Sequence, residues 1–83
     1  MDSMTIDYHL SYYRVACHQL TQGIADPKEF ARVEAIKDAA LCAIALEADI
    51  IREIGSGKLD RPCWEKAIAF IHRYEQADLE IAA

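Results

Sequence analysis

The chain has 83 residues and an acidic balance, with 14 Asp and Glu residues against 9 Lys and Arg residues and a net charge of −5. This length allows one small domain, and a composition that is 53% hydrophobic and 28% charged excludes a disordered tail. The negative charge has the wrong sign for neutralising phosphates, so we expect no nucleic-acid binding. The first residues show no basic segment followed by an apolar one, and no apolar run reaches the roughly 18 residues of a membrane span. These features predict a cytoplasmic protein that does not associate with membranes.

Glycine and proline occur in two places only, residues 23–27 and 55–62, and they divide the chain into three segments. In the first segment, apolar residues recur at steps of four and three, which is the spacing of one helix face. They are Ile6, Leu10, Tyr13, Cys17, Leu20 and Ile24. Ser3 or Thr5 can cap the start of this helix, and the first glycine suits the position just after its end. We predict a helix over residues 4–22.

The second segment opens with a strong helix start. Asp26 is placed to cap the helix, Pro27 stands where its missing N–H is not needed, and Glu29 can return a hydrogen bond to the capping backbone. No breaker follows until Gly55, so we predict a helix over residues 27–54. Its apolar residues form two stripes, which indicates that the helix is covered on two sides. One stripe contains Val33, Ile36, Ala40, Ile44 and Ile51, and the other contains Ala39, Ala43, Leu46 and Ile50.

The third segment follows the second glycine-rich turn. Asp60 or Arg61 can cap it, and Pro62 lies in its first turn, so we predict a helix over residues 61–81. Its apolar face contains Cys63, Ala67, Phe70, Tyr74, Ala77 and Ile81, with Trp64, Ile68 and Ile71 beside it. No segment alternates strictly between apolar and polar residues, as a half-buried strand would. We therefore predict a single all-α domain, a three-helix up-down-up antiparallel bundle built on a long helical hairpin.

The three cysteines, Cys17, Cys42 and Cys63, are an odd number at wide spacing, and we expect free thiols rather than a disulfide. His18 follows Cys17 directly, but adjacent residues on a helix do not face each other, so no reactive thiol–imidazole pair is expected. The Cys and His residues lack the CxxC or HxxxH spacing of a zinc site, so we predict no metal site and no cofactor. A small thiol- or zinc-binding protein that uses the three cysteines and His72 is retained as an alternative.

Glu47 is the carboxylate most closely surrounded by apolar residues, because it lies between two isoleucines on a stripe of the second predicted helix. A general acid would need a partner and a pocket, and the sequence shows neither. We expect it to lie at the edge of the stripe or to pair with Arg14, His18 or Arg73. Since no catalytic set is visible, the chain is predicted to be non-enzymatic.

A second face of the first predicted helix is the strongest candidate for binding. Tyr8, Tyr12 and Val15 lie on the side away from the apolar stripe, where a simple surface helix should be polar. Tyrosine is enriched at interfaces because it combines a large contact area with a polar tip. We predict that these three residues contact a protein partner or a second copy of the chain, with Trp64 as a second candidate contact.

The turn between the first two predicted helices resembles a known family. The stretch from Cys17 to Leu46 is similar to the central part of the small co-chaperones that hold the needle subunit of type III secretion systems. The matching turn has the form Leu-x-x-Gly-x-x-Asp-Pro-x-x-Phe and is formed by Leu20, Gly23, Asp26, Pro27 and Phe30. The needle subunits themselves carry a comparable Asp-Pro turn, so the similarity does not separate the two. It implies a non-enzymatic binding partner whose first two helices contact a larger chaperone.

Together these observations predict a small helical adaptor, co-chaperone or inhibitor that presents helix faces to a protein partner. Two alternatives stay open. One is the thiol- or zinc-binding protein described above, and the other is a phage or mobile-element inhibitor of a host protein that mimics acidic nucleic acid.

Overall fold

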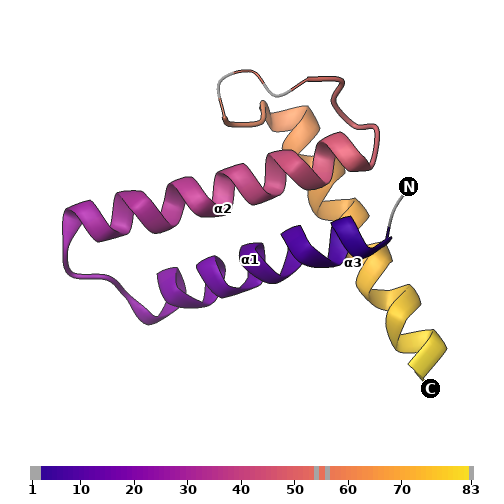
Figure 1. Ribbon diagram of the computed structural model, residues 1–83, viewed down its shortest axis with the longest axis horizontal. Coiled ribbons are helices and arrows are strands. Elements are labelled where there is room, and N and C mark those ends of the chain that lie inside the picture. The colour runs from indigo at the N-terminus through magenta and orange to yellow at the C-terminus, as the bar shows by residue number, and fades with distance from the viewer. Residues whose placement is uncertain (1–2, 54, 56, 83) are drawn as a thin grey trace.

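The computed structural model describes residues 3–53, 55 and 57–82, which form three helices and no strand (Figure 1). Helix α1 spans Ser3–Gln22, α2 spans Pro27–Glu47 and α3 spans Arg61–Ala82. The predicted all-α, three-helix fold is confirmed. No helix in the described part of the chain is long and apolar enough to cross a membrane.

Helices α1 and α2 form an antiparallel hairpin, and α3 crosses behind it near the open end (Figure 1). The crossing is steep, so α3 does not lie alongside its neighbours as the predicted up-down-up bundle requires. The prediction assumed a short connection between the second and third helices. The observed connection covers residues 48–60, and such a length leaves the direction of the next helix free.

The early end of α2 makes this connection long. The helix stops at Glu47, because Ala48 ends it and Asp49 adopts a left-handed conformation with φ of 63°. The N–H of Ile50 donates to the Ala45 carbonyl at 2.8 Å, and the N–H of Asp49 donates to the Leu46 carbonyl at 3.2 Å. These two bonds form a Schellman motif, which usually has glycine at the left-handed position. The predicted helix over 27–54 is therefore too long, although residue 54 itself lies outside the described residues.

The N-terminal caps of α2 and α3 agree more closely with the sequence prediction than the end of α2 does. The Asp26 carboxylate accepts a hydrogen bond from the Lys28 N–H at 3.1 Å and caps α2 as predicted. The predicted return bond from Glu29 does not form, because this carboxylate pairs with Arg32 one turn along. Asp60 caps α3 by accepting from the Cys63 N–H at 3.1 Å.

The core lies where the three helices meet. Its buried members are Leu10, Leu41, Ile44, Ala45, Ala67 and Ile71. Half-buried residues from the loop, including Ile50 and Ile51, pack against it. Burial of these two side chains favours the turn after α2 over a longer helix. The core therefore positions both α3 and the loop against the open end of the hairpin.

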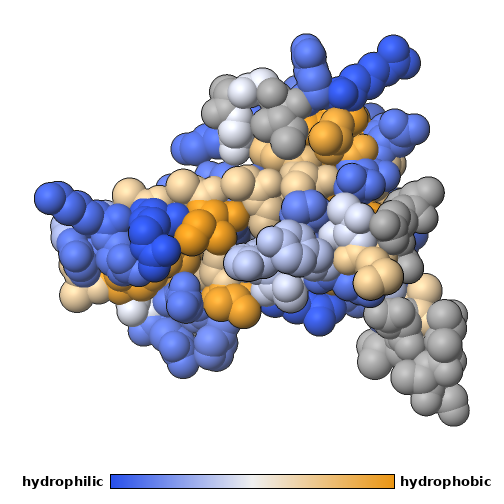
Figure 2. Space-filling model, viewed as in Figure 1, coloured by the Kyte–Doolittle hydropathy of each residue, from blue (hydrophilic) through white to orange (hydrophobic). Residues whose placement is uncertain are grey.

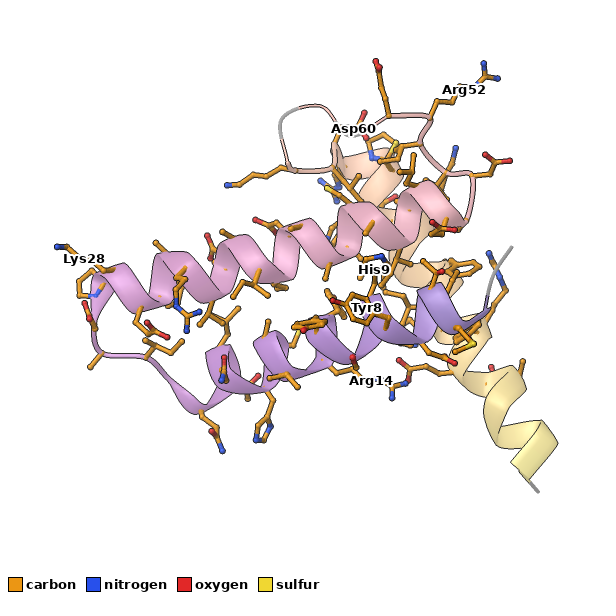
Figure 3. The ribbon with its side chains drawn as sticks, in the orientation of Figure 1. Tyr8, His9, Arg14, Lys28, Arg52 and Asp60 are labelled. Carbon is orange, nitrogen blue, oxygen red and sulfur yellow. The ribbon has the colours of Figure 1, made fainter. Side chains whose placement is uncertain are left out.

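Polar contacts between described residues attach α3 to α1. The Tyr74 hydroxyl donates to the Asp7 carboxylate at 2.6 Å, and Arg14 forms an ion pair with Glu75 at 3.0 Å. Asp7 and Arg14 lie on one side of α1, seven residues apart, and Arg14 extends toward α3 in Figure 3. Helix α3 thus occupies one face of the hairpin.

Candidate functional site

The opposite face of the hairpin carries no helix among the described residues, and we call it the open hairpin face. It is formed by Tyr8, Tyr12 and Val15 on α1 and by Ile36, Ala39 and Ala43 on α2. The three α1 residues are 59%, 52% and 58% exposed, so α3 does not cover them. Their exposure agrees with the predicted second face of the first helix, while their role in binding stays a prediction.

The tyrosines of this face form an aromatic ridge along α1. The rings of Tyr8 and Tyr12 meet edge to face with centroids 5.1 Å apart, and His9 meets Tyr8 at 5.2 Å. Figure 3 shows Tyr8 and His9 between α1 and α2. A hydrogen bond with Tyr12 raises the pKa of the Tyr8 hydroxyl. The two rings therefore act as one preorganised apolar surface with polar tips.

Small residues lie beside the ridge and form a trough on α2. A depression of about 250 Å³ lies between the helices and is lined by the tyrosines, His9, Ile36 and the alanines at 39, 40 and 43. A second depression of about 420 Å³ follows α1 from Tyr8 to Val15. Both are shallow and open. Alanine side chains allow another helix to approach closely, so the trough suits a helix or a row of large side chains.

The two depressions of the open hairpin face are lined by residues without formal charge. The residues that line its two depressions include Ser11 and His9 but none of the Asp, Glu, Lys or Arg residues that the structure describes. The nearest ion pair on α2, between Glu29 and Arg32, lies toward the turn. Figure 2 shows tan and orange surface on this side, interrupted near the centre by pale-blue and blue surface, with further hydrophilic residues at the turn end and around the loop. The face is therefore an apolar strip on an acidic protein.

The α2 side of this face was misjudged from the sequence. The two apolar stripes of α2 predicted cover on both sides, but Ala39 and Leu46 of the second stripe are exposed. The first stripe supplies the buried Val33, Ala40 and Ile44 as expected. An apolar stripe shows which side of a helix could be buried. Whether another element of the same chain buries that side depends on the tertiary packing.

Trp64 lies apart from the open hairpin face. It is 48% exposed in the first turn of α3 and lines neither depression. The structure therefore brings Tyr8, Tyr12 and Val15 together but leaves the fourth predicted contact as a separate exposed residue.

The three cysteine thiols lie outside the open hairpin face. Cys42 and Cys63 line a cavity of about 270 Å³ between the end of α2 and the start of α3, and Cys17 is half-buried on α1. All three are free. Burial raises the pKa of the Cys42 thiol, and a hydrogen bond to the Asp60 carboxylate raises the pKa of Cys63 and lowers that of Asp60. A raised pKa reduces the thiolate fraction that nucleophilic attack and metal binding require.

No group of three or more Cys, His, Asp or Glu side chains in the described part of the chain could hold a metal ion. Glu47 is exposed at the end of α2, and within the described residues it pairs with none of its three predicted partners. Arg14 instead pairs with Glu75. The exposed position of Glu47 agrees with the first alternative, a residue at the edge of the stripe, and not with the predicted ion pair.

No protein-family model matches the chain, and comparisons with curated proteins and with solved structures also found no match. Function is therefore inferred from the geometry of the site itself.

Proposed function

We propose that this chain is a non-enzymatic helical protein that binds a protein partner through the open hairpin face. One observation carries the proposal: the aromatic ridge of Tyr8 and Tyr12 stands exposed beside an alanine trough, with no helix of the described chain packed on it. A row of large apolar side chains at the surface of a small protein loses favourable burial unless something covers it.

The shape of the face favours a protein over a small molecule. Small-molecule sites are concave and enclose most of the ligand, with a few polar groups that converge on it. The two depressions here are shallow strips along a helix pair, and their polar groups are the tyrosine hydroxyls, Ser11 and His9. A strip of this form is typical of helix-in-groove recognition, in which an amphipathic helix lays its apolar side into a groove.

The role that fits best is that of a cytoplasmic adaptor, co-chaperone or inhibitor. The resemblance of the hairpin turn to the needle-subunit co-chaperones of type III secretion is compatible with the co-chaperone role, since the resemblance implies contact through the first two helices. In this role Tyr8, Tyr12 and Val15 supply the central contacts, and Trp64 supplies a second, separate contact on α3. Aromatic residues at the centre of an interface commonly provide most of its affinity.

Site-specific photo-crosslinking tests the proposal directly. A photo-reactive amino acid replaces Tyr12 in cells that naturally make the chain, and the matched control carries it in place of Ala31, which is exposed on another side of α2. We expect covalent adducts with a defined protein from position 12 and none above background from position 31. The same label in place of Trp64 tests the second contact.

Replacement of both tyrosines by serine should abolish the adduct formed from the Val15 position while the helical circular dichroism is preserved. Equal labelling from positions 12 and 31, or no protein adduct from position 12, would show that the open hairpin face does not bind protein.

A further inference from the structure

We infer that the occupant of the open hairpin face is a second copy of this chain, which would form a two-fold symmetric dimer of hairpins. This inference rests on the proposed function and names the partner for the same surface. Two hairpins packed face to face would form a four-helix arrangement, with the two α3 helices on its outer sides.

The accessible surface of the single chain supports this inference. The chain exposes 6031 Å², whereas a folded monomer of 9.4 kDa is expected to expose about 5,000 Å². Its radius of gyration is 13.3 Å, against about 12 Å for a compact domain of this length. The open hairpin face contributes to this exposed surface, because Tyr8, Tyr12 and Val15 are each more than half exposed. An excess of roughly 1,000 Å² is enough for one standard interface, which takes about 800 Å² from each partner.

The face also combines large protruding side chains with small ones. In a two-fold interface each surface patch meets the same patch of the other copy, so a patch must contain both the protruding and the receiving element. Here the ridge of Tyr8, Tyr12 and Val15 lies parallel to a trough of Ala39 and Ala43 on the same face. The ridge of one copy can therefore occupy the trough of the other, and the exchange is reciprocal.

The charge distribution of the chain also supports a second copy as the occupant of the open hairpin face. Each chain carries a net charge of −5, so contact through an acidic surface would bring like charges together. The strip that would meet its own copy carries no Asp, Glu, Lys or Arg among the residues lining its depressions. A strongly charged partner would instead be expected to face complementary charge, which this strip lacks. A neutral strip on an acidic chain suits a copy of itself.

Sedimentation equilibrium over a wide range of protein concentration tests the inference. We expect the wild-type mass to rise toward twice 9.4 kDa with concentration. Ala39→Glu places one carboxylate from each copy in the contact and should weaken the dimer at least tenfold. The control Ala31→Glu puts the same charge on an exposed site of the same helix outside the face and should leave the dimer constant unchanged. If Ala39→Glu does not fold, the paired change Tyr8→Ser with Tyr12→Ser gives the same comparison.

A wild-type chain that stays at the monomer mass at every concentration overturns the inference, as does a folded Ala39→Glu or tyrosine variant that dimerises like the wild type. The outcome is separable from the proposed function. If the chain is monomeric but still crosslinks from position 12 to a different protein, the dimer is refuted and the proposed protein-binding function is retained. A monomeric chain without any adduct removes both.

Discussion

Ile44 offers the clearest test of how the three helices are held together. It is fully buried in the cluster that joins α1, α2 and α3. Replacing it with alanine removes buried carbon atoms and leaves a cavity that a helix junction cannot fully close, which costs about 2–5 kcal/mol. A chain of this length is expected to have an unfolding free energy of about 4–12 kcal/mol. The single change should therefore remove between about one sixth and all of the stability of the fold.

Urea unfolding followed by circular dichroism measures this loss. We expect the midpoint for Ile44→Ala to fall with an unchanged slope, and the melting temperature to drop by about 4–8 °C for each kcal/mol lost. Leu46→Ala is the matched control, because this residue lies on the same helix but is 36% exposed and should cost less than half as much. Each variant is measured at several concentrations, since self-association would add a concentration-dependent contribution. Equal costs for the two variants, or a cost below about 1 kcal/mol for Ile44→Ala, would refute the described core.

Two further predictions concern the end of α2 and the titration of a core tyrosine. Asp49→Gly should raise the unfolding free energy by up to about 1 kcal/mol, because glycine adopts the left-handed conformation freely. Asp49→Val should lower the unfolding free energy, because a β-branched residue is strained in that conformation. A urea midpoint that falls for the glycine variant would contradict this account. Burial, and then the neighbouring Cys17, raise the pKa of Tyr13 from 10.0 to about 12. The folded state therefore holds a proton that the unfolded state releases, so this contribution to stability is complete below pH 10 and is lost as the pH rises through 12. Tyr13→Phe should flatten the fall of the urea midpoint over that range, whereas identical pH profiles for Tyr13→Phe and wild type would rule the effect out.

The helix beginnings and the buried stripes could be predicted from the sequence because they depend on local rules. An aspartate before a proline caps a helix wherever it occurs, and Asp26 does so here. The four-three spacing of the first stripe predicted the buried Ile6 and Leu10. The exposed second side of α1, with Tyr8, Tyr12 and Val15, also follows from the same helical geometry.

The end of α2 could not be predicted in this way. Asp49 carries no turn signal as strong as glycine, and the motif that stops the helix is stabilised by the burial of Ile50 and Ile51 against distant residues of the core. Helix propensity alone predicts that the helix continues, because each residue up to Glu53 is compatible with a helical conformation. The physical reason for the stop is therefore tertiary.

The sequence by itself determined that this protein is helical, where its helices begin, and which side of α1 carries the exposed tyrosines. Only the tertiary structure decided that α3 crosses the hairpin on one face, and this left the ridge of Tyr8 and Tyr12 and the trough at Ala39 uncovered on the other. Periodicity sets which residues share a side of one helix, since it follows from the backbone of that helix alone. Which sides meet depends on the loop after α2 and on the burial gained across the whole core, and these terms are summed over residues far apart in the chain.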